Sequence, residues 1–174
     1  MIRIRRLPEP AVLVEKAEGW KERFLERREA SPKVRPSSGQ YDHADVKDAL
    51  RAMSHGKCFY CERKLSEDEE TVDHFVEIVE DPTLAFTWTN LYLCCDHCQG
   101  KRTSIPRDSA LDPCGDDDED DPADHLTFEN DVIRPKDGSP IGRATIQRYK
   151  LDALGVTYRR AKQLQRLKHL VIGL

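Results

Sequence analysis

The chain has 174 residues, of which 38% are hydrophobic and 34% are charged. This length and composition favour one polar globular domain over two. No apolar run approaches the length of a membrane span, and Pro8 and Pro10 fall where a signal peptide needs an apolar segment. We therefore expect a cytoplasmic protein that is not associated with a membrane. The net charge of −4 is not that of a strongly basic nucleic-acid binder, but much of the acid lies in residues 116–121. Charge therefore neither supports nor excludes a nucleic-acid substrate.

The first 56 residues predict two helices. Apolar residues at helical spacing indicate a helix over 11–29: Leu13, Ala17, Trp20 and Phe24. Residues 31–40 are rich in Pro, Ser and Gly and predict a loop. A second helix is expected over 44–54, with Asp42 as its N-cap and Gly56 as its stop. Its predicted buried stripe consists of Val46, Ala49, Leu50 and Met53.

Two CxxC pairs mark the centre of the chain: Cys58 with Cys61, and Cys95 with Cys98. Four thiolates in this spacing are typical of a tetrahedral zinc site, and without a signal peptide zinc is favoured over disulfides. Because cysteines fill all four positions, the zinc is expected to be structural and to clamp a small unit. Cys94 and Cys114 are not assigned to the zinc site. Cys95 is preferred to Cys94 because only Cys95 has the CxxC spacing to Cys98.

Between and after the pairs, short elements are expected. Residues 70–78 predict a strand, residues 86–89 and 91–93 predict a β-prone stretch, and a short helix is expected from Asp96 onward. The acidic run is expected to be a solvated loop. Residues 126–128 and 132–134 predict a hairpin. Two helices should follow, with a break at Leu154 and Gly155. The first carries Ile146, Tyr149 and Ala153, and the second carries Ala161, Leu164, Leu167 and Val171. The end at Gly173 and Leu174 has no clear cap, which is read as a truncated or partner-completed terminus.

Asp73 and His74 lie on the expected first strand, and Asn90 opens the return strand toward the second CxxC pair. Alone, His74 reads as a half-buried strand histidine and Asn90 as a turn former. Between two CxxC pairs, however, this pattern resembles the HNH (ββα-metal) endonucleases. The resemblance implies an α+β fold with a zinc-stapled ββα-metal core over 57–106. A helical extension over 1–56 would precede this core, and the acidic loop, hairpin and C-terminal helices over 107–174 would complete a single domain.

The resemblance also implies residue roles in phosphodiester hydrolysis. His74 would be the general base, Asp73 and Gln99 would hold a catalytic Mg²⁺ or Mn²⁺, and Asn90 would tie the loop across the site. Gln99 departs from the pattern, because Asn or His is usual in its place and a longer side chain displaces the donor. His97 is a substitute ligand. Lys101 and Arg102, expected at the start of a helix, read either as phosphate contacts or as a solvated basic pair.

Beyond the core, the chain resembles the small HNH nuclease subunit of Septu-type and retron-associated phage-defence systems. The flanking matches are the N-terminal Leu-Pro-Glu-Pro, Trp88-Thr89-Asn90-Leu91 and Leu111-Asp112-Pro113. Glu77 departs from this group, where Pro is common. The resemblance implies an ABC/AAA-type ATPase partner, and the chain has no GxxxxGK[ST] motif of its own. Two alternatives stay open: a catalytically eroded zinc module that binds nucleic acid or a protein, and a redox thiol protein.

Overall fold

A computed structural model describes residues 1–115 and 121–172, so residues 116–120 of the acidic run and the predicted C-terminal end at 173–174 lie outside the described residues. The chain forms two compact units. The N-terminal unit comprises Ile4–Cys58 and Lys64–Asp96, and the C-terminal unit comprises Met1–Arg3, Phe59–Arg63 and His97–Leu174. Helices combine with two small antiparallel sheets, which confirms the α+β class. The predicted partition at residues 57 and 107 and the HNH core stay predictions.

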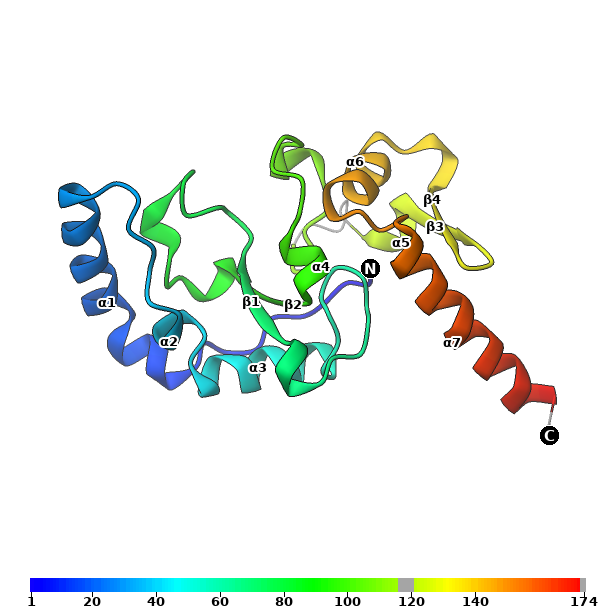
Figure 1. Cartoon of the computed structure of the whole chain (residues 1–174), viewed down its shortest axis with the longest axis horizontal. Helices are drawn as coiled ribbons and strands as arrows, with labels where there is room; N and C mark the ends of the chain where they lie inside the picture. Colours follow the sequence, from blue (N-terminus) through cyan, green and yellow to red (C-terminus); the bar gives the residue numbers. More distant parts are fainter. Residues whose placement is uncertain (116–120, 173–174) are drawn as a thin grey trace. The chain divides into compact units, whose positions relative to one another are not determined.

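The N-terminal unit contains helices α1 (Ala11–Ala30), α2 (Ser38–Tyr41) and α3 (Ala44–Ser54), 3₁₀ helices η1 (Glu67–Glu69), η2 (Pro82–Leu84) and η3 (Trp88–Asn90), and strands β1 (Thr71–His74) and β2 (Leu91–Cys94). Figure 1 shows α1 as the longest of these elements. The short α2 interrupts the segment predicted as a loop.

The predicted apolar stripe of α1 packs as expected. Phe24 is 2% exposed and shares a core with Ile78 and Phe86. The Trp20 and Phe24 rings lie 5.9 and 6.1 Å from the Phe86 ring, and Phe24 meets it edge to face. Large aromatic side chains bury much apolar area, so this cluster fixes α1 against the loop between the two strands.

Helix α3 is capped differently from the prediction at its start. The His43 side chain accepts a hydrogen bond from the Asp45 amide at 3.2 Å, whereas Asp42 pairs with Lys47 at 3.2 Å. Asp42 is therefore not the N-cap. At the other end, His55 adopts a left-handed conformation (φ 54°), and the Gly56 amide (φ 66°) donates to the Arg51 carbonyl at 2.8 Å. This is a Schellman motif, so the predicted stop at Gly56 is confirmed.

Strands β1 and β2 pair antiparallel, with Thr71 opposite Cys94 and His74 opposite Leu91. β1 is shorter than the predicted 70–78. Residues 86–89 are not a strand, because Trp88 begins η3 and its indole nitrogen donates to the Leu7 carbonyl at 2.9 Å. A contact with residues 81 positions earlier in the sequence thus overrides the local β propensity.

The C-terminal unit follows the second CxxC pair. Its elements are α4 (Asp96–Gln99, which starts one residue before the unit), η4 (Arg107–Ser109), α5 (Pro122–His125), β3 (Leu126–Glu129), β4 (Val132–Pro135), η6 (Lys136–Gly138), α6 (Pro140–Tyr149) and α7 (Leu154–Ile172). β3 and β4 form the predicted hairpin, turned at Asn130 (φ 59°). Figure 1 shows α6 beside this hairpin. A Cβ at Gly142 would lie 2.1 Å from the His125 carbonyl oxygen, so only glycine allows this approach.

The C-terminal helices depart from the prediction in two ways. α6 ends at Tyr149 because Lys150 adopts a left-handed conformation (φ 52°), so Ala153 lies outside this helix. Leu154 and Gly155 are the first residues of α7 and do not form a break between the helices. The apolar stripe of α7 is covered only near its start. Val156 is 3% exposed, whereas Leu167 and Val171 are 50% and 72% exposed. Among the described residues, no helix has both the length and the apolar character needed to cross a membrane.

Candidate functional site

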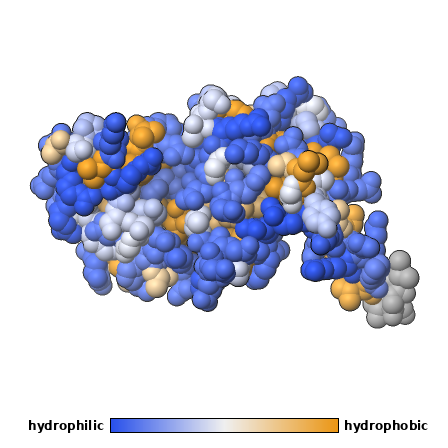
Figure 2. Space-filling view, viewed as in Figure 1, coloured by the Kyte–Doolittle hydropathy of each residue, from blue (hydrophilic) through white to orange (hydrophobic). Residues whose placement is uncertain are grey.

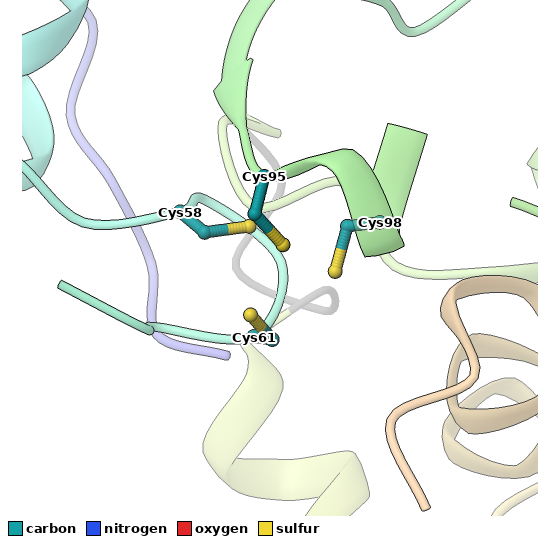
Figure 3. Close-up of side chains that lie close together, drawn as sticks. All are labelled: Cys58, Cys61, Cys95 and Cys98. Atoms are coloured by element: carbon teal, nitrogen blue, oxygen red, sulfur yellow. The ribbon is translucent and has the colours of Figure 1, made fainter. Parts of the chain in front are cut away.

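The four cysteines of the CxxC pairs come together. Cys58 and Cys61 lie in the loop after α3, Cys95 follows β2, and Cys98 lies in α4. All four are buried, and their sulfur atoms lie within 4.8 Å of one another. Figure 3 shows the four side chains pointing toward a common centre. This cluster can hold a metal such as zinc. The choice of Cys95 over Cys94 is confirmed, because the Cys94 sulfur lies 3.2 Å from the Thr71 hydroxyl instead.

The donor set fits a zinc ion. Tetrahedral zinc with sulfurs at about 2.3 Å separates those sulfurs by about 3.8 Å, so a cluster within 4.8 Å needs only small side-chain movements to close on the ion. The chain around the first pair is tightly turned. Lys57 and Lys64 form an isolated antiparallel bridge, and the Leu65 amide donates to the Gly56 carbonyl at 2.9 Å.

The Arg160 guanidinium lies near two of these cysteines, Cys61 and Cys98, which belong to the C-terminal unit as it does. Burial lowers the pKa of the Arg160 guanidinium, whereas the nearby Cys61, Glu62 and Cys98 raise it. Arg160 extends from α7, donates to the Leu151 carbonyl at 2.7 Å and lies 5.4 Å from the Phe128 ring centroid. Four thiolates around a Zn²⁺ ion would carry a net negative charge, and the neighbouring guanidinium would offset part of it.

His74 ends β1 in the N-terminal unit and is 9% exposed. Its Nε2 atom lies 2.9 Å from the Ala85 carbonyl oxygen. A carbonyl oxygen can only accept a hydrogen bond, so Nε2 carries the ring proton and Nδ1 of the neutral imidazole carries the lone pair. The Tyr41 ring lies 4.7 Å from the imidazole and packs beside it. The structure thus fixes both the tautomer and the orientation of His74.

Asp73 precedes His74 on β1 and is 5% exposed. Burial raises the pKa of the Tyr41 phenol, Asp42 and Asp73 raise it further, and Arg35 lowers it. Tyr41 is therefore close to both members of the Asp73-His74 pair and keeps its proton at neutral pH. Its position could not be inferred from the sequence, because Tyr41 reaches the site from α2, more than 30 residues earlier.

Asn90 ties together the loop between the two strands. Its Oδ1 accepts from the Val76 amide at 2.7 Å, and its Nδ2 donates to the Val76 and Leu84 carbonyls at 3.1 Å each. Leu84 directly precedes Ala85, whose carbonyl oxygen accepts the hydrogen bond from His74 Nε2. Asn90 therefore holds the backbone that orients His74. The hydrogen bonding predicted for Asn90 is present, and its part in catalysis stays a prediction.

Arg6 is a supporting residue that the sequence reasoning missed. Its guanidinium donates to the carbonyls of Leu91 and Trp88 at 2.8 and 3.1 Å and to that of Thr89 at 2.8 Å. It also lies 4.4 Å from the Tyr92 ring centroid. These three carbonyls flank Asn90, so Arg6 fixes the turn that carries it. The basic N-terminus gave no signal that one of its arginines serves this purpose.

Replacing Arg6 with alanine is expected to destabilise the protein by about 2–3 kcal/mol, because three carbonyls lose a charged donor. Urea denaturation measures this loss. The matched control is Arg5→Ala, since Arg5 is exposed and adjacent in sequence, and it should change stability by less than about 0.5 kcal/mol. Equal effects of the two substitutions would contradict the role of Arg6.

The remaining predicted residues lie in the C-terminal unit. Gln99 ends α4 and is exposed, and its role as a metal ligand stays a prediction. His97 Nε2 lies 3.1 Å from the Lys150 carbonyl and so anchors α4 to the residue after α6. Lys101 and Arg102 follow α4 and do not start a helix. Lys101 is only 7% exposed, so the reading of a solvated basic pair is wrong for it, whereas Arg102 is exposed.

No family model matches the chain. The chain is similar to Septu protein PtuB of Bacillus mycoides (strain KBAB4), with 30% identity over 93% of the chain and 66% of that protein. It is also similar to Septu protein PtuB of Bacillus thuringiensis, with 28% identity over 88% of the chain and 56% of that protein. The chain thus spans about two thirds of the length of the first relative and a little more than half of the length of the second. Over most of its own length, it is homologous to Septu protein PtuB.

Proposed function

We propose that this chain is a divalent-metal-dependent HNH endonuclease. His74 is its general base, Asp73 and Gln99 hold a catalytic Mg²⁺ or Mn²⁺, Asn90 positions the base, and the cysteine cluster binds structural zinc. The observation that carries the proposal is the 2.9 Å contact between His74 Nε2 and the Ala85 carbonyl, in a loop that Asn90 holds. A histidine held this way presents Nδ1 as a proton acceptor in a fixed direction.

The chemistry follows from that arrangement. A general base must have its acceptor atom aimed at the water that attacks the phosphodiester, and neutral imidazole accepts protons efficiently near pH 7. The buried Asp73 carboxylate offers hard oxygen donors, which suit Mg²⁺ or Mn²⁺. Such an ion would polarise the phosphate and stabilise the leaving oxygen. The protein's own contribution is to orient His74 and to place Asp73 next to it.

We place this nuclease in a Septu-type phage-defence system, in which an ABC/AAA-type ATPase is its partner and phage or host nucleic acid is its target. The similarity to Septu protein PtuB over most of the chain supports this context. The alternative function is an eroded zinc module that only binds. The exposed Gln99, in place of a shorter ligand, is the observation that favours this alternative.

Cleavage of supercoiled plasmid and of total tRNA tests the proposal. We expect the native protein to cut one of them with Mg²⁺ or Mn²⁺ and not to cut when neither ion is added. We expect Gln99→Asn to cut at least as fast, because a shorter amide places its oxygen where the usual ligand lies. His74→Ala is measured alongside, and slower cutting by this variant would show that His74 takes part in the reaction. Cutting by Gln99→Asn alone would favour the eroded module. Cutting that is the same without added Mg²⁺ or Mn²⁺ would contradict metal dependence.

A further inference from the structure

Helix α7 is the basic element of an otherwise acidic chain. It contains five of the 28 Lys and Arg residues and none of the 32 Asp and Glu residues. Its first turns pack against the rest of the C-terminal unit. Val156 is buried, and the Arg160 guanidinium is turned toward Leu151 and Phe128. These contacts fix which face of α7 is covered and which faces solvent.

Three cations lie on a solvent-facing side of α7. Arg159, Lys162 and Arg166 are spaced by three and four residues, which places them on one helical face, and each is exposed. We define these three residues as the basic strip. His169 continues it by one further step, and Tyr158, 60% exposed, lies beside Lys162 with its ring 4.8 Å from the Lys162 ammonium.

The described residues form no salt bridge with the basic strip. Within the described part of the chain, no carboxylate forms a salt bridge with any of its three residues, whereas Arg134 pairs with Glu129 and Lys136 with Asp124 in the same unit. Three like charges on one face of a helix repel one another. An anionic ligand would relieve this repulsion.

We propose that the basic strip of α7 binds the phosphate backbone of nucleic acid, a role that rests on the proposed nuclease function. Arg159 and Arg166 are seven residues apart, about 10 Å along the helix axis, and a DNA duplex carries one charge per about 1.7 Å of its axis. The strip therefore spans several phosphates. The contact is independent of sequence, since backbone contacts position a protein without reading bases.

A membrane surface is a poorer match for this helix. A helix that lies on a membrane needs its whole apolar face available to lipid, with bulky aromatic residues on that face. In α7 the start of that face is already covered at Val156, and the exposed apolar residues toward the end of the helix are aliphatic: Leu167, Leu170 and Val171. Figure 2 shows hydrophobic surface of limited extent at the C-terminal end of α7, surrounded by hydrophilic residues.

The test is the salt dependence of binding, measured by fluorescence anisotropy with a labelled 30-bp duplex and no added Mg²⁺ or Mn²⁺, so that nothing is cut and the structural zinc is kept. Neutralising the strip with Arg159→Gln, Lys162→Gln and Arg166→Gln together removes three phosphate contacts. The slope of log K against log salt should become shallower by about 2.7, which corresponds to about 40-fold in affinity between 50 and 200 mM salt. The matched control neutralises Lys16, Arg23 and Lys33, which are exposed in the N-terminal unit, and should change the slope by less than about 1.

An unchanged slope in the strip variant, or an equal change in the control, would overturn the proposal. Equal, strip-dependent binding to poly-L-glutamate or to vesicles containing anionic lipid would also overturn it, because the strip would then be a general anion or lipid contact. The measurement does not depend on catalysis. If His74→Ala left cleavage unchanged while the strip still set the slope, the nuclease assignment would fail and nucleic-acid binding by α7 would stand.

Discussion

Replacing Cys61 with serine is expected to abolish stoichiometric zinc binding and to unfold the region around the cysteine cluster. Structural zinc in small domains contributes about 10–16 kcal/mol of apparent binding energy, which is comparable to or larger than the whole stability of an ordinary domain. Zinc content by mass spectrometry and thermal unfolding by circular dichroism measure the two effects.

The control for this substitution is Cys114→Ser. Cys114 is also buried, at 9% exposure, but it is not a member of the cluster. The Cys114→Ser protein should retain one zinc ion per chain and lose only a small part of its free energy of unfolding. A strong chelator should reproduce the effect of Cys61→Ser on the native protein. A Cys61→Ser protein that keeps native zinc content and a native melting curve would contradict a zinc site at these four cysteines.

Replacing His74 with alanine is expected to slow nucleic-acid cleavage by a factor of about 10²–10⁴, the usual contribution of a general base. The reason is the fixed tautomer: hydrogen bonding of Nε2 to the Ala85 carbonyl leaves Nδ1 as the proton acceptor, and alanine offers none. Single-turnover cleavage with saturating protein measures the chemical step directly. Far-UV circular dichroism should stay native, because the substitution changes one side chain at the end of β1 and leaves the backbone hydrogen bonds of the strand pair in place.

Tyr41→Phe is the matched control for His74→Ala, because it keeps the ring that packs on the imidazole and removes only the phenol oxygen. It should cut within about threefold of the native rate. If His74→Ala also cut within about threefold of the native rate, His74 would not be the base. The eroded zinc module would then be the better account of this chain.

The sequence alone predicted those features that depend on residues close together in the chain. The CxxC spacing identified the four cysteines that cluster and chose Cys95 over Cys94, because two cysteines three residues apart in one turn converge almost regardless of context. The stripe of α1 predicted its buried face for a similar reason, since helical periodicity fixes which residues share a side. The hairpin of β3 and β4 likewise followed from alternating apolar residues and a turn.

Distant contacts decided what the sequence could not. Trp88 belongs to a 3₁₀ helix because its indole reaches Leu7, and the Asn90 turn is fixed by Arg6, more than 80 residues away. The hydrogen-bonding partner of His74 is the carbonyl of Ala85, which has no side-chain signature. Such partners depend on how the loop closes, and local propensity contains no information about that closure.

Helix α7 shows the same division. Its sequence determined a helix with an apolar stripe and an excess of positive charge, because both are properties of residue type and spacing. Only the tertiary structure decided that the stripe is buried at Val156 and exposed at Leu167, and that Arg160 turns inward while Arg159, Lys162 and Arg166 face solvent. The physical reason is that burial depends on which residues outside the helix cover a face, and the spacing of residues within the helix does not specify them.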